Sequence, residues 1–388
     1  MATVPVKPEL IRWAIDRSRL PGDALKKFPI DKWTRGEKQP TLKQLEDFAK
    51  RTMTPVGYLF LDAPPVEALP VPDYRTIGDA PIDRPSPNLI DTLHDIQRRQ
   101  EWVRDDLIEQ GREPLAFVGI AKKPPIETLA IRMRKTLGLA DDWARRKSTW
   151  EDALRELRDA AERTGVFVAS SGTVGLNTRR TLDPQEFRGF VLCDKFAPFV
   201  FVNSADAKSA QMFTLAHELA HVWLGQDGLF NLIGTFPKNT ATERFCNQVA
   251  AEFLIPAAML NDRWSQAQST EQPFRTIARW FKVSPIVAAR RALDLRLIER
   301  PAFFRFYEQE QAEWQQRKEF QKEARSGGPN FYTVQDVRLS RRFAASVVRA
   351  SREGRLQYLE AYRLTGLRGD KFNRYSDILM GRLKDEQR

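Results

Sequence analysis

The sequence predicts an α+β protein in which a small antiparallel sheet is flanked by helical regions toward both ends of the chain. Two β-rich runs, 187–193 and 198–203, are joined by a connection of hairpin length, which predicts two antiparallel strands. Most other segments space their apolar residues at the helical period. Residues 62–87 hold seven prolines in 26 positions. Because proline at this density excludes helix and central strand, this stretch is predicted to be an extended linker.

Length and charge narrow the classes of protein. The 388 residues include 62 Lys and Arg against 51 Asp and Glu, a net charge of +11. Residues 326–388 carry 13 basic and 7 acidic side chains, which predicts either a solvated helical surface or a surface for nucleic acid. The two cysteines, Cys193 and Cys246, exclude a disulfide scaffold and indicate a reducing cytoplasm. No apolar run reaches the ~18–20 residues that span a bilayer, and the first residues lack a signal-peptide core, so no membrane partner is expected.

The N-terminal residues 8–60 have the pattern of four or five short helices, and Thr41 stands where it can cap the helix 41–51. Since the proline-rich stretch separates this region from the rest, four parts are expected: a helical domain at 1–61, the linker at 62–87, a central domain at 88–300 with its core at 150–260, and a basic helical domain at 301–388.

Helical patterns continue beyond the linker. Ser148 and Glu151 have the spacing of a capping box, which predicts a helix over 149–163 that Gly165 ends. Strand territory begins at 166–169. The other predicted helices are 88–111, 126–138, about 206–224, about 242–254, 275–298, 303–325 and a final helical unit from about 335, which a Gly-Gly-Pro break at 327–329 separates.

Two of the three histidines, His217 and His221, stand in the run HELAH on the predicted helix 206–224. Positions i and i+4 lie one above the other on a helix face, so both imidazoles can reach one metal ion. Glu218 projects beside that ion and can hold the water that the metal polarises. Chance produces HExxH in only about a few per thousand chains with so few histidines. Metal binding is therefore favoured over two unrelated histidines that flank a glutamate.

A catalytic zinc needs a third protein ligand and one open position for water. On the next helix, Glu243 and Asn247 share a face, which places Glu243 to ligate and Asn247 to hold a histidine by a hydrogen bond. Glu252 is the rival ligand, but nine positions after Glu243 it points to the opposite side of the helix. The plain alternative for Glu243 is a solvated acid that the helix dipole stabilises.

The remaining candidates have simpler interpretations. Cys193 and Cys246 are expected to pack as small apolar residues, and His94 to lie on a helix surface. The stretch 171–177 contains glycines but lacks the lysine of a phosphate loop. The hairpin over 187–203 directly precedes the metal helix. Its strands are expected either to pair with an extended substrate or to be ordinary members of the sheet.

The run 186-EFRGFVLCDKFAPFVFVNSADAKSAQMFTLAHELAHVWLG-225, followed by 243-ERFCNQVAAEFLIP-256, resembles the ImmA/IrrE metallopeptidases over about residues 150–300. The resemblance implies a zincin-like (gluzincin-type) fold with one Zn²⁺ per chain. It implies His217 and His221 as ligands, Glu218 as the general base and Glu243 as the third ligand. Members of this family act in the cytoplasm and typically cleave a repressor. A zinc-dependent endopeptidase with a repressor-like protein substrate is therefore expected.

The N-terminus resembles an XRE-type helix-turn-helix through 33-WTRGEKQPTLKQLEDFAKR-51. Only eight residues lie between Ala24 and Trp33, fewer than a usual turn and recognition helix need, and Pro29 is among them. Residues 1–61 are therefore predicted either to bind DNA or to dock a partner protein, such as one encoded nearby. The segments 275–298 and 345–380 also have helix-turn-helix character. Either this pattern reflects helical packing alone, or the C-terminal domain is a second candidate for DNA binding.

The alternative to an enzyme is a transcriptional regulator or antitoxin component that binds DNA or protein. In that protein the zinc site would be structural or vestigial. Glu218 favours the enzyme, because a structural zinc has no need of an acid beside it and is usually closed by a fourth ligand.

Overall fold

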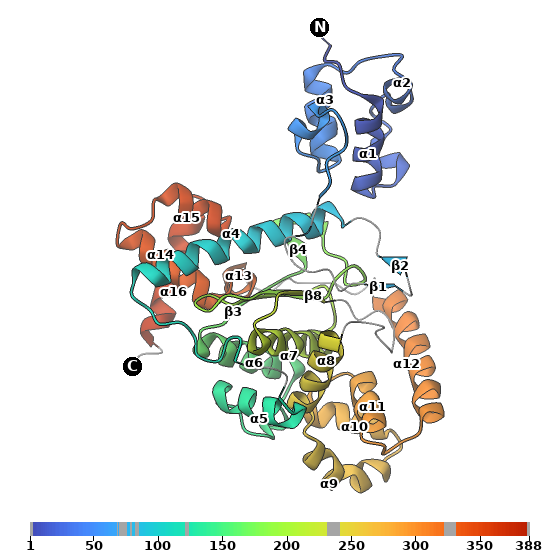
Figure 1. Cartoon of the computed structure of the whole chain (residues 1–388), viewed down its shortest axis with the longest axis vertical. Coiled ribbons are helices and arrows are strands. Elements are labelled where there is room, and N and C mark those ends of the chain that lie inside the picture. Colours follow the sequence, from blue (N-terminus) through green and yellow to red (C-terminus); the bar gives the residue numbers. More distant parts are fainter. Residues whose placement is uncertain are drawn as a thin grey trace. The chain divides into compact units, whose positions relative to one another are not determined.

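The computed structural model describes residues 3–67, 69, 76–77, 80–81, 85–120, 124–230, 241–321 and 331–385. The described chain is mostly helical with a small sheet and helical flanks, which confirms the predicted α+β class (Figure 1). Contacts divide it into two compact units, Met1–Pro70 with Pro81–His94, and Val71–Ala80 with Asp95–Arg388. The division predicted near residue 300 stays a prediction. None of the described helices is long and apolar enough to cross a membrane.

The first unit begins with five helical segments: α1 (Pro8–Ser18), η1 (Gly22–Leu25), α2 (Ile30–Thr34), α3 (Leu42–Arg51) and η2 (Val56–Phe60). Their apolar faces, including Leu10 and Phe48, form one core. The predicted N-cap of α3 is confirmed, because the Thr41 hydroxyl accepts a hydrogen bond from the Gln44 backbone N–H at 3.3 Å and the Gln44 side chain accepts one from the Thr41 N–H at 3.0 Å. This reciprocal pair satisfies two N–H groups that a helix start leaves open.

Of the 26 residues of the predicted linker 62–87, 12 lie outside the described residues. Its described parts include two short strands, β1 (Thr76–Ile77) and β2 (Ala80–Pro81), which pair with each other. The helix α4 (Pro87–Glu109) follows and confirms the helix predicted at 88–111.

The main sheet has four strands in the order β3-β7-β6-β8, and a separate hairpin joins β4 to β5. The strands are β3 (Phe167–Ser171), β4 (Thr173–Val174), β5 (Asn177–Thr181), β6 (Gly189–Leu192), β7 (Phe199–Asn203) and β8 (Gly228–Phe230). The predicted hairpin is confirmed, since β6 and β7 are antiparallel with Phe190 opposite Phe201. The purely antiparallel sheet is wrong, because β3 runs parallel to β7. Parallel strands need a long connection, and the chain between β3 and β7 includes the β4–β5 hairpin and β6. β3 can therefore pair with the edge of β7 that β6 does not occupy.

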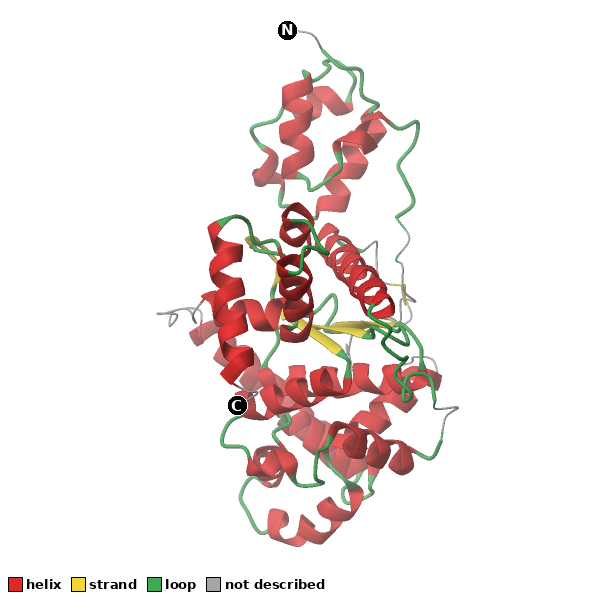
Figure 2. Ribbon diagram, turned by 90° about the vertical axis from the view of Figure 1, so that its left-hand side faces the viewer, coloured by secondary structure: helices red, strands yellow, loops and turns green. Residues whose placement is uncertain are grey.

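The hairpin strands are interior strands rather than a free edge. β6 pairs with both β7 and β8, and β7 pairs with both β3 and β6. All residues of β6 and β7 are buried, as expected where helices cover both faces of a sheet. Figure 2 shows the strands between helical layers. The expectation that the 187–203 hairpin itself receives a substrate strand is therefore wrong, and within the described chain the sheet ends at β3 and β8.

Helices α6 and α7 pack against the sheet, and α8 packs against α5 and α7. The elements of this layer are α5 (Ile126–Leu137), η3 (Trp143–Arg146), α6 (Trp150–Thr164), α7 (Lys208–Leu224) and α8 (Ala241–Leu254). Gly165 ends α6 with a φ of 109°, as predicted. The predicted cap at Ser148 is wrong by one residue, because the hydroxyl that accepts the Asp152 N–H, at 3.0 Å, is that of Thr149. Either hydroxyl can cap a helix, so local sequence does not choose between them.

The remaining helices are α9 (Ala257–Gln268), α10 (Pro273–Phe281), α11 (Pro285–Asp294), α12 (Arg300–Gln321), α13 (Phe331–Leu339), α14 (Arg341–Arg352), α15 (Tyr358–Thr365) and α16 (Asp370–Asp385). The region predicted as helix over 275–298 is two helices, α10 and α11, with a break at 282–284. The Gly-Gly-Pro break at 327–329 lies outside the described residues. The C-terminal helices join the sheet directly, because α13 and α14 both contact β3.

Candidate metal centre

The helix α7 carries the HELAH residues through the interior of its unit. Every residue from Gln211 to Leu224 is buried. Gly225 ends the helix in the left-handed conformation, with a φ of 67°, and its N–H caps the last carbonyls. A Cβ at this glycine would come within 2.8 Å of the Gly119 Cα, so only glycine permits the two backbones to approach so closely. The sequence therefore builds a rigid buried helix and stops it one turn after His221.

His217, His221 and Glu243 form one compact group in which α8 supplies the carboxylate. The two histidine Nε2 atoms are 3.2 Å apart. Nε2 of His217 lies 3.1 Å from one Glu243 oxygen, and Nε2 of His221 lies 2.9 Å from the other. Each of the three residues is at most 1% exposed. The structure thus brings together the three side chains that the sequence analysis named as ligands.

Glu218 lies in the same buried region, one position along α7, and is 0% exposed. Neither of its carboxylate oxygens has a hydrogen-bond partner among the described residues. A Cβ at Gly189 of β6 would come within 3.3 Å of one of these oxygens and within 2.5 Å of the Thr214 side chain. The absence of a side chain at Gly189 therefore keeps space beside Glu218. A buried carboxylate without partners is costly, so this glutamate calls for a functional explanation.

Burial and charge set the protonation of the group. Burial lowers the pKa of the His217 imidazole, although the Glu243 carboxylate acts in the opposite direction. Burial raises the pKa of Glu218 well above its ordinary value, and the negative charge of Glu243 raises it further. Burial alone would also raise the pKa of Glu243, but the two histidines outweigh it and the pKa is lowered. Glu243 therefore favours the charged form and Glu218 the neutral form, which separates a ligand from a proton carrier.

Of the other residues that the sequence analysis named, one lies beside the metal group and the rest lie elsewhere. The Asn247 side chain lies beside the His217 imidazole and raises its pKa. Glu252 does not join the group, because its carboxylate pairs with Arg291. Cys246 is buried in the apolar core, as expected. His94 is exposed on α4, also as expected.

Asp227 is a neighbour that the sequence analysis did not identify. It follows the end of α7 and accepts a hydrogen bond from the backbone N–H of Cys193 at 2.5 Å. Burial raises the pKa of Asp227, while the charge of His221 lowers it. This carboxylate therefore ties the end of β6 to the segment after the metal helix. The signal in the sequence is weak, because an Asp-Gly pair after a helix is typical of any loop.

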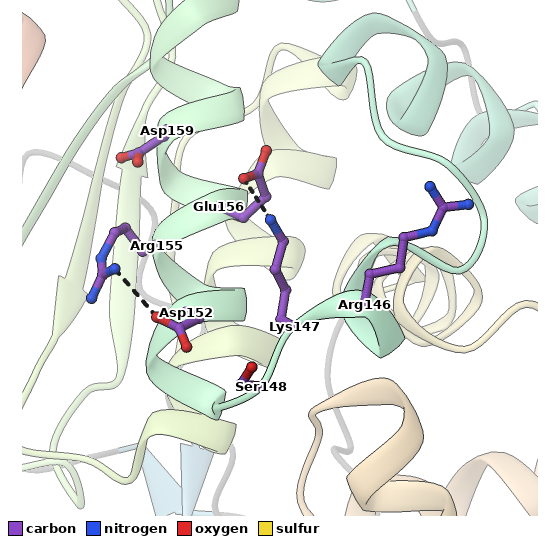
Figure 3. Close-up of a pocket in the computed structure, with 7 residues that line it drawn as sticks. All are labelled: Arg146, Lys147, Ser148, Asp152, Arg155, Glu156 and Asp159. Carbon is purple, nitrogen blue, oxygen red and sulfur yellow. Dashed lines mark hydrogen bonds and ion pairs between the residues drawn. The ribbon is translucent and has the colours of Figure 1, made fainter.

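A surface groove elsewhere in the same unit is a different feature (Figure 3). Both signs of charge line it, and two pairs of these charges neutralise each other: Lys147 with Glu156 at 3.0 Å, and Arg155 with Asp152 at 3.2 Å. None of the residues of the metal group lines this groove. Its charges are therefore satisfied within the protein, and no ligand follows from them.

The donor set fits a zinc ion. Four ligands at about 2.0–2.2 Å from a tetrahedral zinc lie roughly 3.4 Å from one another, which is close to the separations of the three donor atoms. Two imidazoles and one carboxylate are the usual set for a catalytic zinc with an open position. The unpartnered oxygens of Glu218 supply an acceptor for a water at that position. The group and its surroundings define a centre of the HExxH class.

Comparison with known proteins agrees with this class for the middle of the chain. Residues 161–293 match the family model of the IrrE N-terminal-like domain, a peptidase family (M78), and residues 339–377 match a domain of unknown function, DUF8813. None of the curated proteins is significantly similar. A transcriptional regulator from Mycobacterium tuberculosis is similar in structure, with 16% identity, a TM-score of 0.26, and 50% of this chain and 51% of that chain covered. Neither family match reaches residues 1–61, where the XRE-like module stays a prediction.

Proposed function

We propose that this protein is a zinc-dependent endopeptidase that cleaves a regulatory protein, such as a repressor, in the cytoplasm. One observation carries the proposal: the buried, unpartnered carboxylate of Glu218 lies beside two histidines and a glutamate that fit one metal ion. A structural zinc site gains nothing from such a carboxylate. The match of residues 161–293 to a peptidase family supports the same assignment.

In the proposed reaction His217, His221 and Glu243 hold the zinc, which when bound supplies a Lewis acid and lowers the pKa of water toward ~7. Glu218 accepts the proton of the attacking water and returns it to the leaving amine. A carboxyl whose pKa is raised by burial suits this exchange, because its carboxylate is a stronger proton acceptor than that of an exposed glutamate. Asn247 orients the His217 ring and is a positioning residue.

Substrate access and alignment follow from the burial of the group and from the sheet order. All four side chains are at most 1% exposed, so a substrate has to displace part of the chain to reach them. The strand β8 directly follows the metal helix and contacts α7. Within the described chain it pairs on one side only, with β6. An extended peptide can therefore add to its free side as a further strand.

Zinc content and cleavage test the proposal together. Protein purified without added metal is expected to hold about one zinc per chain, and the His217→Ala variant to lose it. A cell lysate treated with the wild-type chain is expected to show new protein N-termini that the Glu218→Gln variant does not produce, although this variant keeps its zinc. Full cleavage by Glu218→Gln would contradict the proposed mechanism.

A second candidate is a regulatory binding protein with a structural zinc. The burial of the whole group favours it, because a structural site is usually closed to solvent. The same experiment separates the two. Zinc in both the wild-type and the Glu218→Gln chains, with no cleavage by either, would favour the regulator.

A further inference from the structure

The helices α15 and α16 are joined by a turn of a defined kind. Only Gly366–Gly369 separate them, and the two glycines have φ values of 71° and 52°. The Thr365 hydroxyl donates to the Ala361 carbonyl at 2.8 Å and accepts the Leu367 N–H at 3.2 Å. A four-residue turn with glycine directly after the first helix is typical of a helix-turn-helix. The side-chain hydrogen bonds hold this turn in one conformation.

An apolar core holds the two helices together, and α14 lies next to both (Figure 1). Leu364, Leu367, Phe372 and Tyr375 are each at most 2% exposed. The ring centroids of Tyr362 on α15 and Phe372 on α16 are 5.4 Å apart. On the α14 side, α15 packs against this helix. Three short helices around one core are the framework on which a recognition helix is normally presented.

The outward face of this helix pair is basic and free to make contacts. Arg368 in the turn and Lys371, Asn373 and Arg374 in the first turns of α16 are all exposed. Neither Arg368 nor Lys371 has an ion pair among the described residues, whereas Arg374 lies over the Tyr332 ring at 5.6 Å. Across residues 331–385, 12 Lys and Arg face 6 Asp and Glu, a net charge of +6. Such an excess attracts the phosphates of a nucleic acid.

Two other helix pairs, α10–α11 and α2–α3, were also candidates for a helix-turn-helix. Neither pair combines the features seen in α15–α16. In α11, no residue from Pro285 to Leu293 is exposed, and this helix packs against α12. In the first unit, α2 has only five residues. On α3, the exposed Lys43 is paired with Asp47 at 3.1 Å. Of these pairs, only α15–α16 combines a short turn, a packed core and an exposed basic second helix.

We propose that residues 341–385 form a DNA-binding helix-turn-helix in which α16 is the recognition helix and lies in the major groove. Its 16 residues extend about 24 Å, a length that a major groove accommodates. Arg368 and Lys371 then neutralise phosphates, and Asn373 faces the base edges, where asparagine reads adenine through two hydrogen bonds. This proposal does not depend on the metal centre.

The β4–β5 hairpin extends the same surface. A Cβ at Gly366 would lie 3.4 Å from the Leu176 side chain at the tip of this hairpin, so the tip is next to the turn. The exposed Arg179 follows on β5. A basic hairpin beside a helix-turn-helix adds a contact to the DNA backbone next to the groove that the helix enters. Arg179 is therefore assigned to a phosphate on the flank of the site.

Fluorescence anisotropy with a labelled DNA duplex, enriched from a random-sequence pool on the full-length protein, tests the proposal across a KCl series. The Arg368→Ala/Lys371→Ala variant is expected to bind at least ~tenfold more weakly, with a salt slope smaller by about two. The Asn373→Ala variant is expected to keep the slope and to accept a wider set of sequences. The matched control, Lys43→Ala/Lys50→Ala on α3, removes the same charge and is expected to bind like the wild-type chain.

Each other outcome overturns the proposal. No binding of the duplex at the lowest salt would do so. Loss of binding in the α3 control, with unchanged binding in the α16 variant, would assign DNA binding to the first unit. Equal or tighter binding of a random single-stranded RNA pool would assign this surface to RNA. Circular dichroism melting of each variant separates lost contacts from lost folding, and the readout requires no cleavage by the metal centre.

Discussion

The metal centre and the C-terminal helix pair place polar side chains in opposite environments. Around HELAH, four ionisable groups lie together at no more than 1% exposure. Burial lowers the pKa of His217 and raises that of Glu218, so both groups favour their neutral forms. On α16 and the turn before it, Arg368 and Lys371 stay in water. Desolvation makes the first region expensive and chemically tuned. Because water solvates the charges of the second region, exposing them costs little free energy and leaves them accessible to a partner.

The two regions therefore differ in how their side chains affect stability and function. A buried polar group affects both, because its removal changes packing, charge and chemistry together. An exposed charge affects binding and leaves folding nearly unchanged. Substitutions in the two regions should therefore differ in which measurement they move, as follows.

The largest effect is expected from Glu218→Gln. Loss of the proton acceptor should lower kcat/KM by about 10²–10⁴-fold, while zinc content stays near that of the wild-type chain. The measurement is the rate at which a substrate identified from new N-termini is cleaved. Glu308→Gln, the same change at an exposed site on α12, is the control and should keep full activity.

The next effect concerns Glu162, a buried carboxyl outside the metal group. Burial raises its pKa to about 7, although the Ser340 hydroxyl donates to it at 2.6 Å. Between pH 4.5 and 7 the unfolded chain binds fewer protons at this group than the folded chain, so its contribution to stability is lost as pH rises. The loss amounts to roughly 3 kcal/mol. Urea unfolding at several pH values should show a smaller fall in stability with rising pH in Glu162→Gln than in the wild-type chain, and the difference is the share of Glu162.

Glu156, on the same helix as Glu162, is expected to change stability with pH in the opposite direction. The ion pair with Lys147 lowers the pKa of Glu156, so its contribution to stability is present at neutral pH and lost on acidification. Glu156→Gln should therefore leave the slope between pH 4.5 and 7 unchanged. An identical pH dependence in wild-type and Glu162→Gln chains would contradict the assignment to Glu162.

A smaller effect is expected at Asn247. Its interaction with His217 orients a proposed ligand, so Asn247→Ala should weaken zinc binding by about 10–100-fold, as removal of such supporting residues usually does. Competition with a zinc chelator measures the affinity. The exposed neighbour Gln248→Ala should bind zinc like the wild-type chain. Equal affinities for the two variants would show that Asn247 does not position the histidine.

The smallest effect on folding is expected on the C-terminal surface. Arg368→Ala with Lys371→Ala should change the free energy of unfolding by less than about 0.5 kcal/mol, because both side chains are exposed. Leu364→Ala, a few residues away in the core, should cost about 2–5 kcal/mol. Denaturant unfolding of the two variants makes the comparison. A large loss of stability in the charge variant would mean that these arginine and lysine side chains support the fold.

Sequence reasoning was accurate where neighbouring residues decide the structure. The capping box at Thr41, the end of α6 at Gly165 and the antiparallel pairing of β6 and β7 all depend on contacts over a few positions. It was wrong where two local solutions are equivalent, as with Ser148 and Thr149. It was also wrong where distant strands choose a neighbour, since nothing near β3 specifies a parallel partner.

By itself, the sequence determined that His217 and His221 share one helix face with Glu218 beside them, because the helical repeat sets these positions. Only the tertiary structure decided that Glu243 meets the histidines while Glu252 turns to Arg291, because core packing sets how α8 is rotated against α7. It also decided that the metal group is buried and that α16 is exposed. Burial depends on contacts between segments far apart in the chain, and no local pattern encodes them.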